Sequence, residues 1–484
     1  MNESIWKKYI INNEASLNKD LYVDVLIIGG GITGLSIAYN LINKNLNVAV
    51  VEKNELFSGV TSKTTAKITY LQENIYSTLK LYFNQNISKE YFDSQRDAID
   101  KLINIIKTNN ILCDLDKVSS YLVSDKNNLE KLNKEKQLLE CFDVNFKSGF
   151  KLPSGEKFNS IISVDDTYVF NPIKYLNSIR DICKTNDIKF YTNTSILKIE
   201  KMNNRYCSYT DINKIKSKYV VLALHYPYFL FPFLTPIKCS LEKSYICAFK
   251  DKKNYKYSAI TVSNPVKSIR YYDDGKKIYK IQLNGSHNIS VKNNEKHNFD
   301  NIDNSGESVD YTWSNIDIMT NDRLPYIGKL KDGLLIATGY NTWGMTNATL
   351  AGKIISDIIL NKENKYIKLF NPKRNINIGK IINFPISLTS NIYSFIKSKT
   401  YSEKKWYDSV EIKTINNKKV GIYTDSNNVD HIVFIKCPHL GCNLIFNEVE
   451  LTWDCPCHGS RFDVDGKSIE GPSNYNIGYN KNKN

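Results

Sequence analysis

The sequence predicts an α/β domain built on a parallel sheet, with an α+β second part, followed by a small all-β domain. Two observations carry this prediction: a glycine-rich turn between a buried strand and a helix near the N-terminus, and a group of cysteine and histidine residues near the C-terminus. The length of 484 residues exceeds what one hydrophobic core usually supports, so we expect two or three domains. The hydrophobic and charged fractions, 42% and 24%, are those of a folded globular protein.

The α/β unit begins with a strand, a turn, a helix and a second strand. Residues 22–28 form a run rich in β-branched side chains, as a buried parallel strand requires. The turn GGGITG at 29–34 follows, an apolar helical pattern continues over 35–42, and the second strand covers 47–52. The N-terminus of the helix directs free N–H groups at the turn, where they can bind an anion.

The glycines of this turn have separate roles. Gly29 allows the tight turn, Gly31 lets the backbone approach a pyrophosphate, and Gly34 lets the helix pack on the strand. Glu52, at the end of the second strand, is placed to accept hydrogen bonds from a ribose diol. The combination predicts a site for FAD or NAD, and the motif alone does not choose between them.

A second turn of this kind lies near residue 340. Residues 334–338 predict another buried strand, and an apolar helical pattern follows over 350–358. A helix N-terminus at this place would stabilise the negative charge of a reduced flavin. The alternative is an ordinary glycine-rich loop. The candidate cofactor contacts in the turn are Gly339, Gly344, Met345 and Thr346.

Together these segments resemble the D-amino acid oxidase superfamily of FAD-dependent oxidoreductases, over roughly residues 20–375. The resemblance is carried by the turn 29–34 with Glu52 and by the segments 58–67, 321–328 and 337–344. It implies FAD as the cofactor and a Rossmann-like FAD-binding domain joined to an α+β substrate domain. In the family, the segment after the acidic residue covers the diphosphate and the flavin. The resemblance therefore implies FAD contacts by Thr61, Thr64, Thr65 and Lys67.

Residues 219–227 resemble the strand that, in this family, returns beside the cofactor. Members often carry a glycine at its end, where this chain has Ala223-Leu224-His225. His225 is a weak candidate for a general base or for a hydrogen bond to the flavin, and the alternative is a structural histidine at a strand end. The catalytic residues are otherwise unknown from the sequence.

The second site is a pair of cysteine and histidine motifs. Cys437 and His439 form a C-x-H pair, and Cys455 and His458 form a C-x-x-H pair. Two thiolates and two imidazoles can hold tetrahedral zinc. They can also hold a Rieske 2Fe-2S cluster, with the cysteines on one iron and the histidines on the other. An additional cysteine in each motif and the small residues around them favour the cluster.

The stretch closely resembles the Rieske domain of cytochrome bc-type complexes. The resemblance implies that the additional cysteines, Cys442 and Cys457, form a disulfide, and that Ser460 donates a hydrogen bond to the cluster. Phe462 stands where high-potential members have a tyrosine that reaches a ligand sulfur. Fewer hydrogen bonds destabilise the reduced cluster, so we expect a potential below that of the respiratory proteins. The known range of Rieske clusters runs from about −150 to +300 mV.

These readings divide the chain into three parts. We expect an FAD-dependent oxidoreductase over 1–365, a linker over 366–405 and a Rieske domain over 406–480. The expected FAD-binding part covers about 20–75, 150–225 and 320–365, and the expected substrate part covers about 76–149 and 226–319.

The composition limits the partners. The net charge is +15, but the lysines are scattered and no arginine and aromatic stripe is present, so we expect no nucleic-acid partner. The longest uncharged apolar stretch, 219–234, is broken by two prolines and is shorter than the roughly 20 residues of a transmembrane helix. The N-terminus lacks the apolar core of a signal peptide. We therefore expect a cytoplasmic protein without a transmembrane span.

The whole chain resembles a group of bacterial proteins, the YhfW-like group, in which a flavoprotein of this type is fused to a C-terminal Rieske domain. The expected function is oxidation of a C–N bond of an amine or amino acid by hydride transfer to the flavin. The cluster would pass the electrons to an external electron-transfer partner. Two alternatives stay open. One is a reductase that takes electrons from a protein donor through the cluster to the flavin and an acceptor, and the other is a non-catalytic redox sensor.

Overall fold

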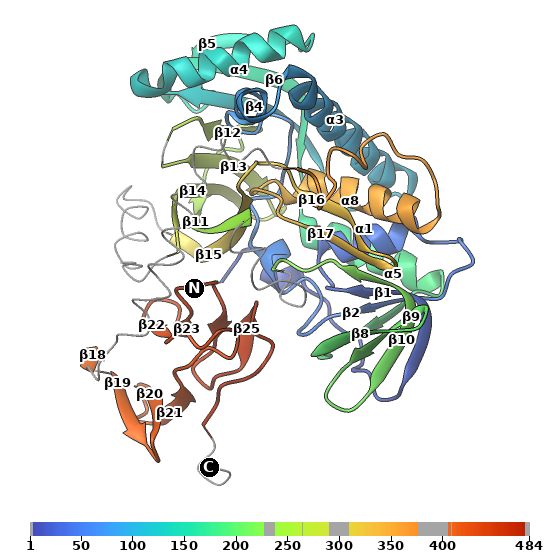
Figure 1. The fold of residues 1–484 in the computed structure, drawn as a ribbon. Coiled ribbons are helices and arrows are strands. Elements are labelled where there is room, and N and C mark those ends of the chain that lie inside the picture. The colour runs from blue at the N-terminus through green and yellow to red at the C-terminus, as the bar shows by residue number, and fades with distance from the viewer. Residues whose placement is uncertain are drawn as a thin grey trace.

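The computed structural model describes residues 3–226, 238–263, 265–289, 309–375 and 409–479, together with the backbone of 405–407. Most of the predicted linker, from 376 to 404, lies outside the described residues. Figure 1 shows a body with one sheet and the helices α1, α5 and α8, an upper body with a second sheet and the helices α3 and α4, and a C-terminal body of short strands at the lower left, below the upper body.

The first sheet, sheet A, has the strand order β16-β17-β10-β1-β2-β7, with β9 and β8 extending from β10. The strands β17, β10, β1, β2 and β7 pair in parallel, as the buried β-branched runs predict. Their carboxyl ends therefore meet at one edge of the sheet. The bounds are β1 (Leu21–Ile28), β2 (Val48–Val51), β7 (Lys189–Tyr191), β8 (Lys198–Met202), β9 (Arg205–Tyr209), β10 (Lys214–Leu222), β16 (Tyr326–Lys331) and β17 (Leu334–Thr338).

Helices α1 (Ile32–Asn40), α5 (Pro172–Thr185) and α8 (Gly344–Ile359) accompany this sheet (Figure 1). Helices α1 and α8 lie against each other so closely that a Cβ atom on Gly352 would lie 2.6 Å from the carbonyl oxygen of Ser36. The close contact brings the two helices together beside the carboxyl edge of sheet A. Among the described residues of the N-terminal half there are also three short 3₁₀ helices, η1 (Lys7–Tyr9), η2 (Val60–Lys63) and η3 (Lys126–Asn128).

The second sheet, sheet B, has the order β15-β11-β14-β13-β12-β4-β6-β3, with β5 paired to β6. Strand β6 comes from the segment predicted for the FAD-binding part, but it pairs antiparallel with β4 along most of its length and so extends sheet B. The bounds are β3 (Lys67–Ile68), β4 (Asp116–Ser124), β5 (Lys147–Lys151), β6 (Lys157–Val169), β11 (Cys239–Asp251), β12 (Tyr257–Thr261), β13 (Lys267–Asp273), β14 (Ile278–Asn288) and β15 (Val309–Thr320), with helices α2 (Ile75–Tyr82), α3 (Gln85–Thr108) and α4 (Leu129–Cys141).

The C-terminal domain consists of two four-stranded antiparallel sheets, which confirms the predicted all-β fold. The sheets meet where the indole of Trp453 fills the space left by Gly421, whose Cβ atom would lie 2.3 Å from the ring. The bounds are β18 (Lys405–Tyr407), β19 (Val410–Ile415), β20 (Lys418–Thr424), β21 (Asp430–Phe434), β22 (Ile445–Asn447), β23 (Thr452–Asp454), β24 (Arg461–Phe462) and β25 (Ser468–Glu470).

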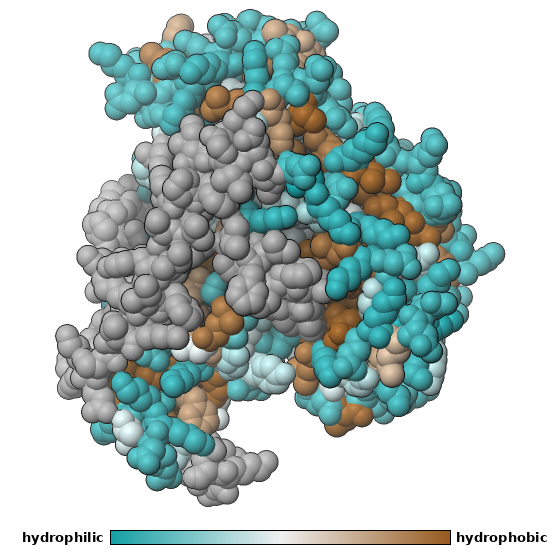
Figure 2. Space-filling view, viewed as in Figure 1, coloured by the Kyte–Doolittle hydropathy of each residue, from teal (hydrophilic) through white to brown (hydrophobic). Residues whose placement is uncertain are grey.

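In the face shown in Figure 2, hydrophilic residues cover most of the described surface, with apolar residues in smaller patches between them. Within the described residues, no helix has both the length and the apolar character that crossing a membrane demands.

Candidate functional site

The glycine turn after β1 has the geometry that the sequence predicts. Gly29 has φ +114°, in the region that favours glycine, and a Cβ atom there would lie 2.3 Å from the carbonyl oxygen of Ala223. A Cβ atom on Gly34 would lie 2.0 Å from the carbonyl oxygen of Gly29, so only glycine lets α1 start this close to the strand. Helix α1 begins after Gly31 without a side-chain cap among the described residues. The N–H of Ile32 donates to the hydroxyl of Thr61 at 3.2 Å, and the N–H groups that follow it at the helix N-terminus are suited to an anion.

Glu52 follows β2 and reaches back to the same turn. Its carboxylate accepts a hydrogen bond from the backbone N–H of Gly30 at 2.8 Å and one from Asn54 at 3.0 Å. The two bonds hold the carboxylate beside the glycine turn, where a ribose diol of a bound dinucleotide would lie.

A cavity at this edge of sheet A, which we name the cofactor cavity, collects most of the predicted contacts. The parts of the chain that carry the predicted contacts meet there: the glycine turn with Glu52, the segment that includes η2, and the ends of β10 and β17. The predicted residues that line it are Gly29, Gly31, Glu52, Thr61, Thr64, His225, Gly339, Gly344 and Met345.

Three predicted contacts lie elsewhere. Thr65 and Lys67 line a neighbouring cavity. The buried hydroxyl of Thr346 donates a hydrogen bond to Gln95 at 2.7 Å, so this side chain is directed at α3. Their roles as FAD contacts stay predictions.

The donors of the cofactor cavity fit FAD. Helix α8, like α1, begins without a side-chain cap among the described residues, and its first residues Gly344 and Met345 line the cavity. Two uncapped helix N-termini thus open on one cavity, one at the glycine turn and one at the turn after β17. The first suits a pyrophosphate and the second suits the electron-rich edge of a flavin ring.

His225 lies in the same cavity, just after β10. Its Nε2 atom is buried and has no hydrogen-bond partner among the described residues. Burial lowers the pKa of the imidazole to about 4, so the ring is neutral at pH 7. A neutral ring with one buried, unpartnered nitrogen is suited to a hydrogen bond with a group bound in the cavity.

The neighbouring cavity, which we name the inner cavity, has a volume of about 620 Å³. It shares Thr64, Asn341, Thr342, Gly344 and Met345, among others, with the cofactor cavity, so the two adjoin. Ionisable side chains of both signs line it, namely Lys63, Lys67, Glu73, Lys131, Glu242, Asp317 and Arg323.

Burial sets the charge of these groups. It raises the pKa of Glu73 to about 7 against the attraction of Arg323, and it raises the pKa of Asp317 to about 7. It lowers the pKa of the Lys67 ammonium to about 7. These groups therefore change protonation near neutral pH, which is common in sites that handle charged substrates.

The cysteine and histidine motifs lie in two loops of the C-terminal domain, 437–442 and 455–460, which we name the cluster loops. The rings of His439 and His458 lie side by side, with centroids 4.9 Å apart and planes at 89°. The Nδ1 atom of each ring is buried and has no partner among the described residues. Burial lowers the pKa of His439 to about 4 and that of His458, with the help of its neighbour, to about 3. Both imidazoles are thus neutral, as metal ligands must be.

The two ligand cysteines face each other next to the histidines. The pKa of the Cys437 thiol is lowered because Cys455 hydrogen-bonds to it. Against the effect of burial, the backbone N–H groups of His439 and Leu440 and the hydroxyl of Ser460 also donate to the sulfur. Thiolates that accept several hydrogen bonds are what a 2Fe-2S cluster uses as ligands. The four side chains therefore fit the predicted cluster.

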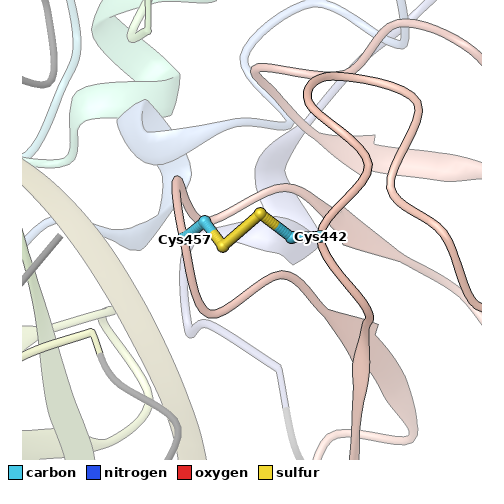
Figure 3. The surroundings of a disulfide bond; sticks show 2 residues. All are labelled: Cys442 and Cys457. Carbon is cyan, nitrogen blue, oxygen red and sulfur yellow. A yellow bond between two sulfur atoms is a disulfide. The ribbon is translucent and has the colours of Figure 1, made fainter. Parts of the chain in front are cut away.

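The predicted disulfide is confirmed. Cys442 and Cys457 are bonded to each other and join the cluster loops (Figure 3). Their sulfur atoms and that of Cys455 lie within 4.8 Å of one another. Two of these three sulfurs are used by the disulfide, and the assignment of Cys437, Cys455 and the two histidines as iron ligands stays a prediction.

The sequence did not predict how the C-terminal domain contacts the FAD-binding part. Residues 469–471 and Asn474 of this domain line the cofactor cavity. The amide of Asn474 donates to the carbonyl of Ile196 at 3.1 Å, and the amide of Asn54 donates to the carbonyl of Ile469 at 3.3 Å. The C-terminal domain is thus part of the cavity wall.

A buried ion-pair network, which we name the interface network, holds the same contact. Glu450 binds Lys243 of β11 at 2.8 Å and Arg461 at 2.9 Å, and Glu470 binds Lys63 of η2 at 2.8 Å. Lys243 and Arg461 are each only 3% exposed. No local motif marks these residues, because their partners lie far away in the sequence.

Comparison with known proteins agrees with both sites. The FAD dependent oxidoreductase (DAO) family matches residues 24–358, and the Rieske [2Fe-2S] domain family matches residues 393–479. The Rieske 2Fe-2S iron-sulfur protein YhfW of Bacillus subtilis (strain 168) is 29% identical over 495 residues, which cover 97% of this chain and 96% of that protein. The cytochrome b6-f complex iron-sulfur subunit 2 of Trichormus variabilis is 50% identical over 38 residues, 8% of this chain and 21% of that protein.

Solved structures share the fold of the larger part. Glycine oxidase from Geobacillus kaustophilus has a TM-score of 0.62 at 15% identity, and the match covers 74% of this chain and all of that one (100%). The L-amino acid deaminase from Proteus vulgaris has a TM-score of 0.60 at 15% identity, with 76% and 100% covered. The chain therefore belongs to the DAO family of FAD dependent oxidoreductases and carries a Rieske 2Fe-2S domain at its C-terminal end.

Proposed function

We propose that this protein oxidises the C–N bond of an amine or amino acid and passes the electrons through its own Rieske domain to an external partner. One observation carries the proposal: residues 469–471 and Asn474 of the Rieske domain line the cofactor cavity. FAD held in the cofactor cavity would supply a hydride acceptor for the substrate, and a 2Fe-2S cluster held by the cluster loops would supply a one-electron acceptor. The substrate leaves as an imine after losing a hydride and a proton, so two electrons reach the acceptor for each turnover.

The inner cavity supports the assignment of the substrate class. It adjoins the cofactor cavity and presents groups of both signs, as a zwitterionic amino acid requires. We assign Arg323 and Lys67 to the substrate carboxylate, and Glu73 and Asp317 to the ammonium group, because opposite charges are favoured in a buried site. A neutral amine at the reacting carbon favours hydride loss, and carboxylates with a pKa near 7 can take up the released proton.

A second structural argument favours a dehydrogenase over an enzyme that passes its electrons directly to oxygen. Two ion pairs of the interface network hold the C-terminal domain against the oxidoreductase part of the chain, at the cofactor cavity. A one-electron carrier held at this place gives the reduced flavin an internal acceptor. The partner that removes the electrons from the cluster is then a one-electron carrier.

The test is an anaerobic screen of amines and amino acids on the protein loaded with FAD and cluster. Flavin absorbance and the electron-spin signal of the reduced cluster are followed together. We expect an active compound to bleach the flavin and to produce the cluster signal in the same sample. Bleaching without any cluster signal would show that no internal relay exists. A flavin that no amine or amino acid bleaches would contradict the proposed substrate class.

Two variants serve as controls. Cys455→Ser removes an iron ligand, so the substrate should still bleach the flavin while the cluster signal is lost. Arg323→Gln removes the proposed carboxylate anchor and should raise the KM for amino acids by at least about tenfold, the equivalent of about 1.4 kcal/mol, with a smaller effect on simple amines. An equal effect on both classes would contradict the role given to Arg323.

A further inference from the structure

Tyr226 occupies the space between the two cofactor sites. It follows His225 directly, and its ring contacts both imidazoles of the cluster loops. The ring centroid lies 6.4 Å from that of His439 and 6.3 Å from that of His458, in edge-on arrangements. The side chain is 7% exposed, so protein atoms surround the ring on almost all sides.

The same residue belongs to the wall of the cofactor cavity. Ala223, Leu224, His225 and Tyr226 line this cavity in sequence, after the end of β10. The hydroxyl of Thr338, at the end of β17, donates to the carbonyl of His225 at 2.6 Å. The segment is therefore fixed to the centre of sheet A just before Tyr226. One short, anchored segment thus contacts the cofactor cavity on one side and both histidines on the other.

The C-terminal domain has contacts that keep the histidines at this place. Gly459, next to His458, packs against sheet B, where a Cβ atom on it would lie 3.3 Å from Leu241 and 3.7 Å from Ile316. The interface network fixes the same domain through Glu450 and Glu470. The contact between the tyrosine ring and the imidazoles is thus enclosed by packing and ion pairs, and it needs no movement of the domain to form.

We propose that Tyr226 is the bridging residue through which electrons pass between the flavin and the histidine-ligated iron of the cluster. The inference rests on the proposed function, because it concerns the path of the same relay. With both cofactors bound, one electron lost by the reduced flavin would reduce the ferric iron held by the histidines, and the ring between them would be neither oxidised nor reduced overall. Tyr226 acts as a positioning residue that fills the gap with a polarisable ring and keeps water out of it.

The experiment uses the full protein with both cofactors and needs no substrate. A light pulse on a deazaflavin sensitiser with a sacrificial donor reduces the flavin, and absorbance follows the transfer of the electron to the cluster. Tyr226→Phe keeps the ring and should change the rate by less than about threefold. Tyr226→Leu removes the ring and should slow the transfer by at least about tenfold, equivalent to a barrier rise of about 1.4 kcal/mol. Leu241→Ala removes a packing contact of the same cluster loop and should stay within about threefold of the native rate.

A second measurement does not depend on the transfer rate. The reduced cluster is prepared chemically in heavy water, and electron spin-echo spectroscopy reads the nitrogen couplings of the two histidines and the deuterium near them. In Tyr226→Leu the nitrogen couplings should persist, because the ligands remain. The deuterium signal should increase, because water enters the space of the ring.

The outcomes distinguish the proposed electron relay from the bridging role of Tyr226. A native protein whose flavin and cluster exchange no electron after the light pulse would refute the relay and, with it, the bridge. A native protein with rapid exchange and a Tyr226→Leu variant that is equally fast would refute the bridge alone. An unchanged deuterium signal in Tyr226→Leu would also count against it, since the ring would not be what covers the histidines.

Discussion

We expect Ser460, at the end of the second cluster loop, and Phe462, just after it, to influence how well a reduced cluster is stabilised. Both are fully buried, and the Ser460 hydroxyl donates to Cys437 while it accepts from the backbone N–H of Ser473 at 3.0 Å. Ser460→Ala should therefore lower the reduction potential, and Phe462→Tyr should raise it, because hydrogen bonds to a ligand sulfur favour the more negative reduced state.

Protein-film voltammetry measures both changes on the same scale. We expect the native potential to lie well below about +200 mV within the known Rieske range, and a shift of some tens of millivolts in opposite directions for the two variants. A native potential well above about +200 mV would contradict the interpretation of Phe462. Leu440→Ala is the matched control, because Leu440 is 39% exposed and only its backbone N–H donates a hydrogen bond to the sulfur of Cys437.

Glu52 is the residue that we expect to bind the ribose of the nucleotide. Its carboxylate is held by Gly30 and Asn54, so it is already oriented before a ribose binds. Glu52→Gln removes the charge that strengthens hydrogen bonds from the diol, and a charged hydrogen bond contributes about 1.5–3 kcal/mol. We expect the Kd of the apoprotein for FAD to rise by at least about tenfold, measured by quenching of flavin fluorescence. Glu55→Gln, an exposed change in the same loop, should leave the Kd unaltered.

The cluster loops are the element where one covalent bond decides the local order. The disulfide between Cys442 and Cys457 closes a loop with a sequence separation of 15. Closing a loop of this length stabilises a fold by about 3 kcal/mol through the unfolded chain. The double variant Cys442→Ala/Cys457→Ala should therefore lose iron and sulfide at a lower denaturant concentration than the native protein. Iron release, followed by a chelator dye during a urea titration, measures this, while Cys247→Ala in sheet B should show no such effect.

The elements predicted from the sequence are those whose chemistry is local. The turn at Gly29 and the end of the next strand at Glu52 lie on one short unit, so spacing alone places them together. The cluster loops could be predicted for the same reason, since each supplies one cysteine and one histidine as candidate iron ligands within a few residues. The strands of sheet B were harder to assign, because β6 joins this sheet through pairing with β4 and not through any pattern of its own.

The contacts between the domains could not be predicted for a physical reason. Lys243 and Glu450 are 207 residues apart, and Lys63 and Glu470 are 407 apart. A single charged residue in a strand usually lies in solvent, and nothing in its surroundings marks the few that become buried at an interface. The position of Tyr226 could not be predicted either, because nothing in the sequence distinguishes this tyrosine from the many others in the chain.

At the scale of the whole molecule, the interface network decides whether the two domains stay together. Glu450 faces Lys243 and Arg461, and the hydroxyl of Ser314 also donates to it at 2.7 Å. Glu450→Gln leaves two buried cations with less compensation, and breaking a buried ion pair costs about 3–5 kcal/mol. We expect the free energy of unfolding, measured by urea titration, to fall by an amount near the lower end of this range. Asp454 still lies 3.1 Å from Arg461 and compensates part of its charge.

Glu130→Gln is the control for this variant. It removes an exposed ion pair with Lys134 on helix α4, and such pairs contribute only about 0.3–0.5 kcal/mol. If Glu450→Gln destabilised the protein no more than Glu130→Gln does, the interface network would have no part in holding the domains.

The interface also predicts how stability depends on acid. Burial alone would raise the pKa of Glu470, but its ion pairs with Lys63 and Arg461 outweigh burial and lower the pKa from 4.5 to about 2. Because the folded pKa is the lower one, the stabilisation is complete above about 4.5 and is lost as the pH falls towards 2. The free energy of unfolding should therefore fall between about pH 5 and about pH 2, and that of the Glu470→Gln variant should fall less steeply over this range. The same acid range should release the C-terminal domain from the cofactor cavity, which cleavage by an acid-active protease would report. A Glu470→Gln variant with the native pH dependence would show that this carboxylate is not what couples domain contact to protonation.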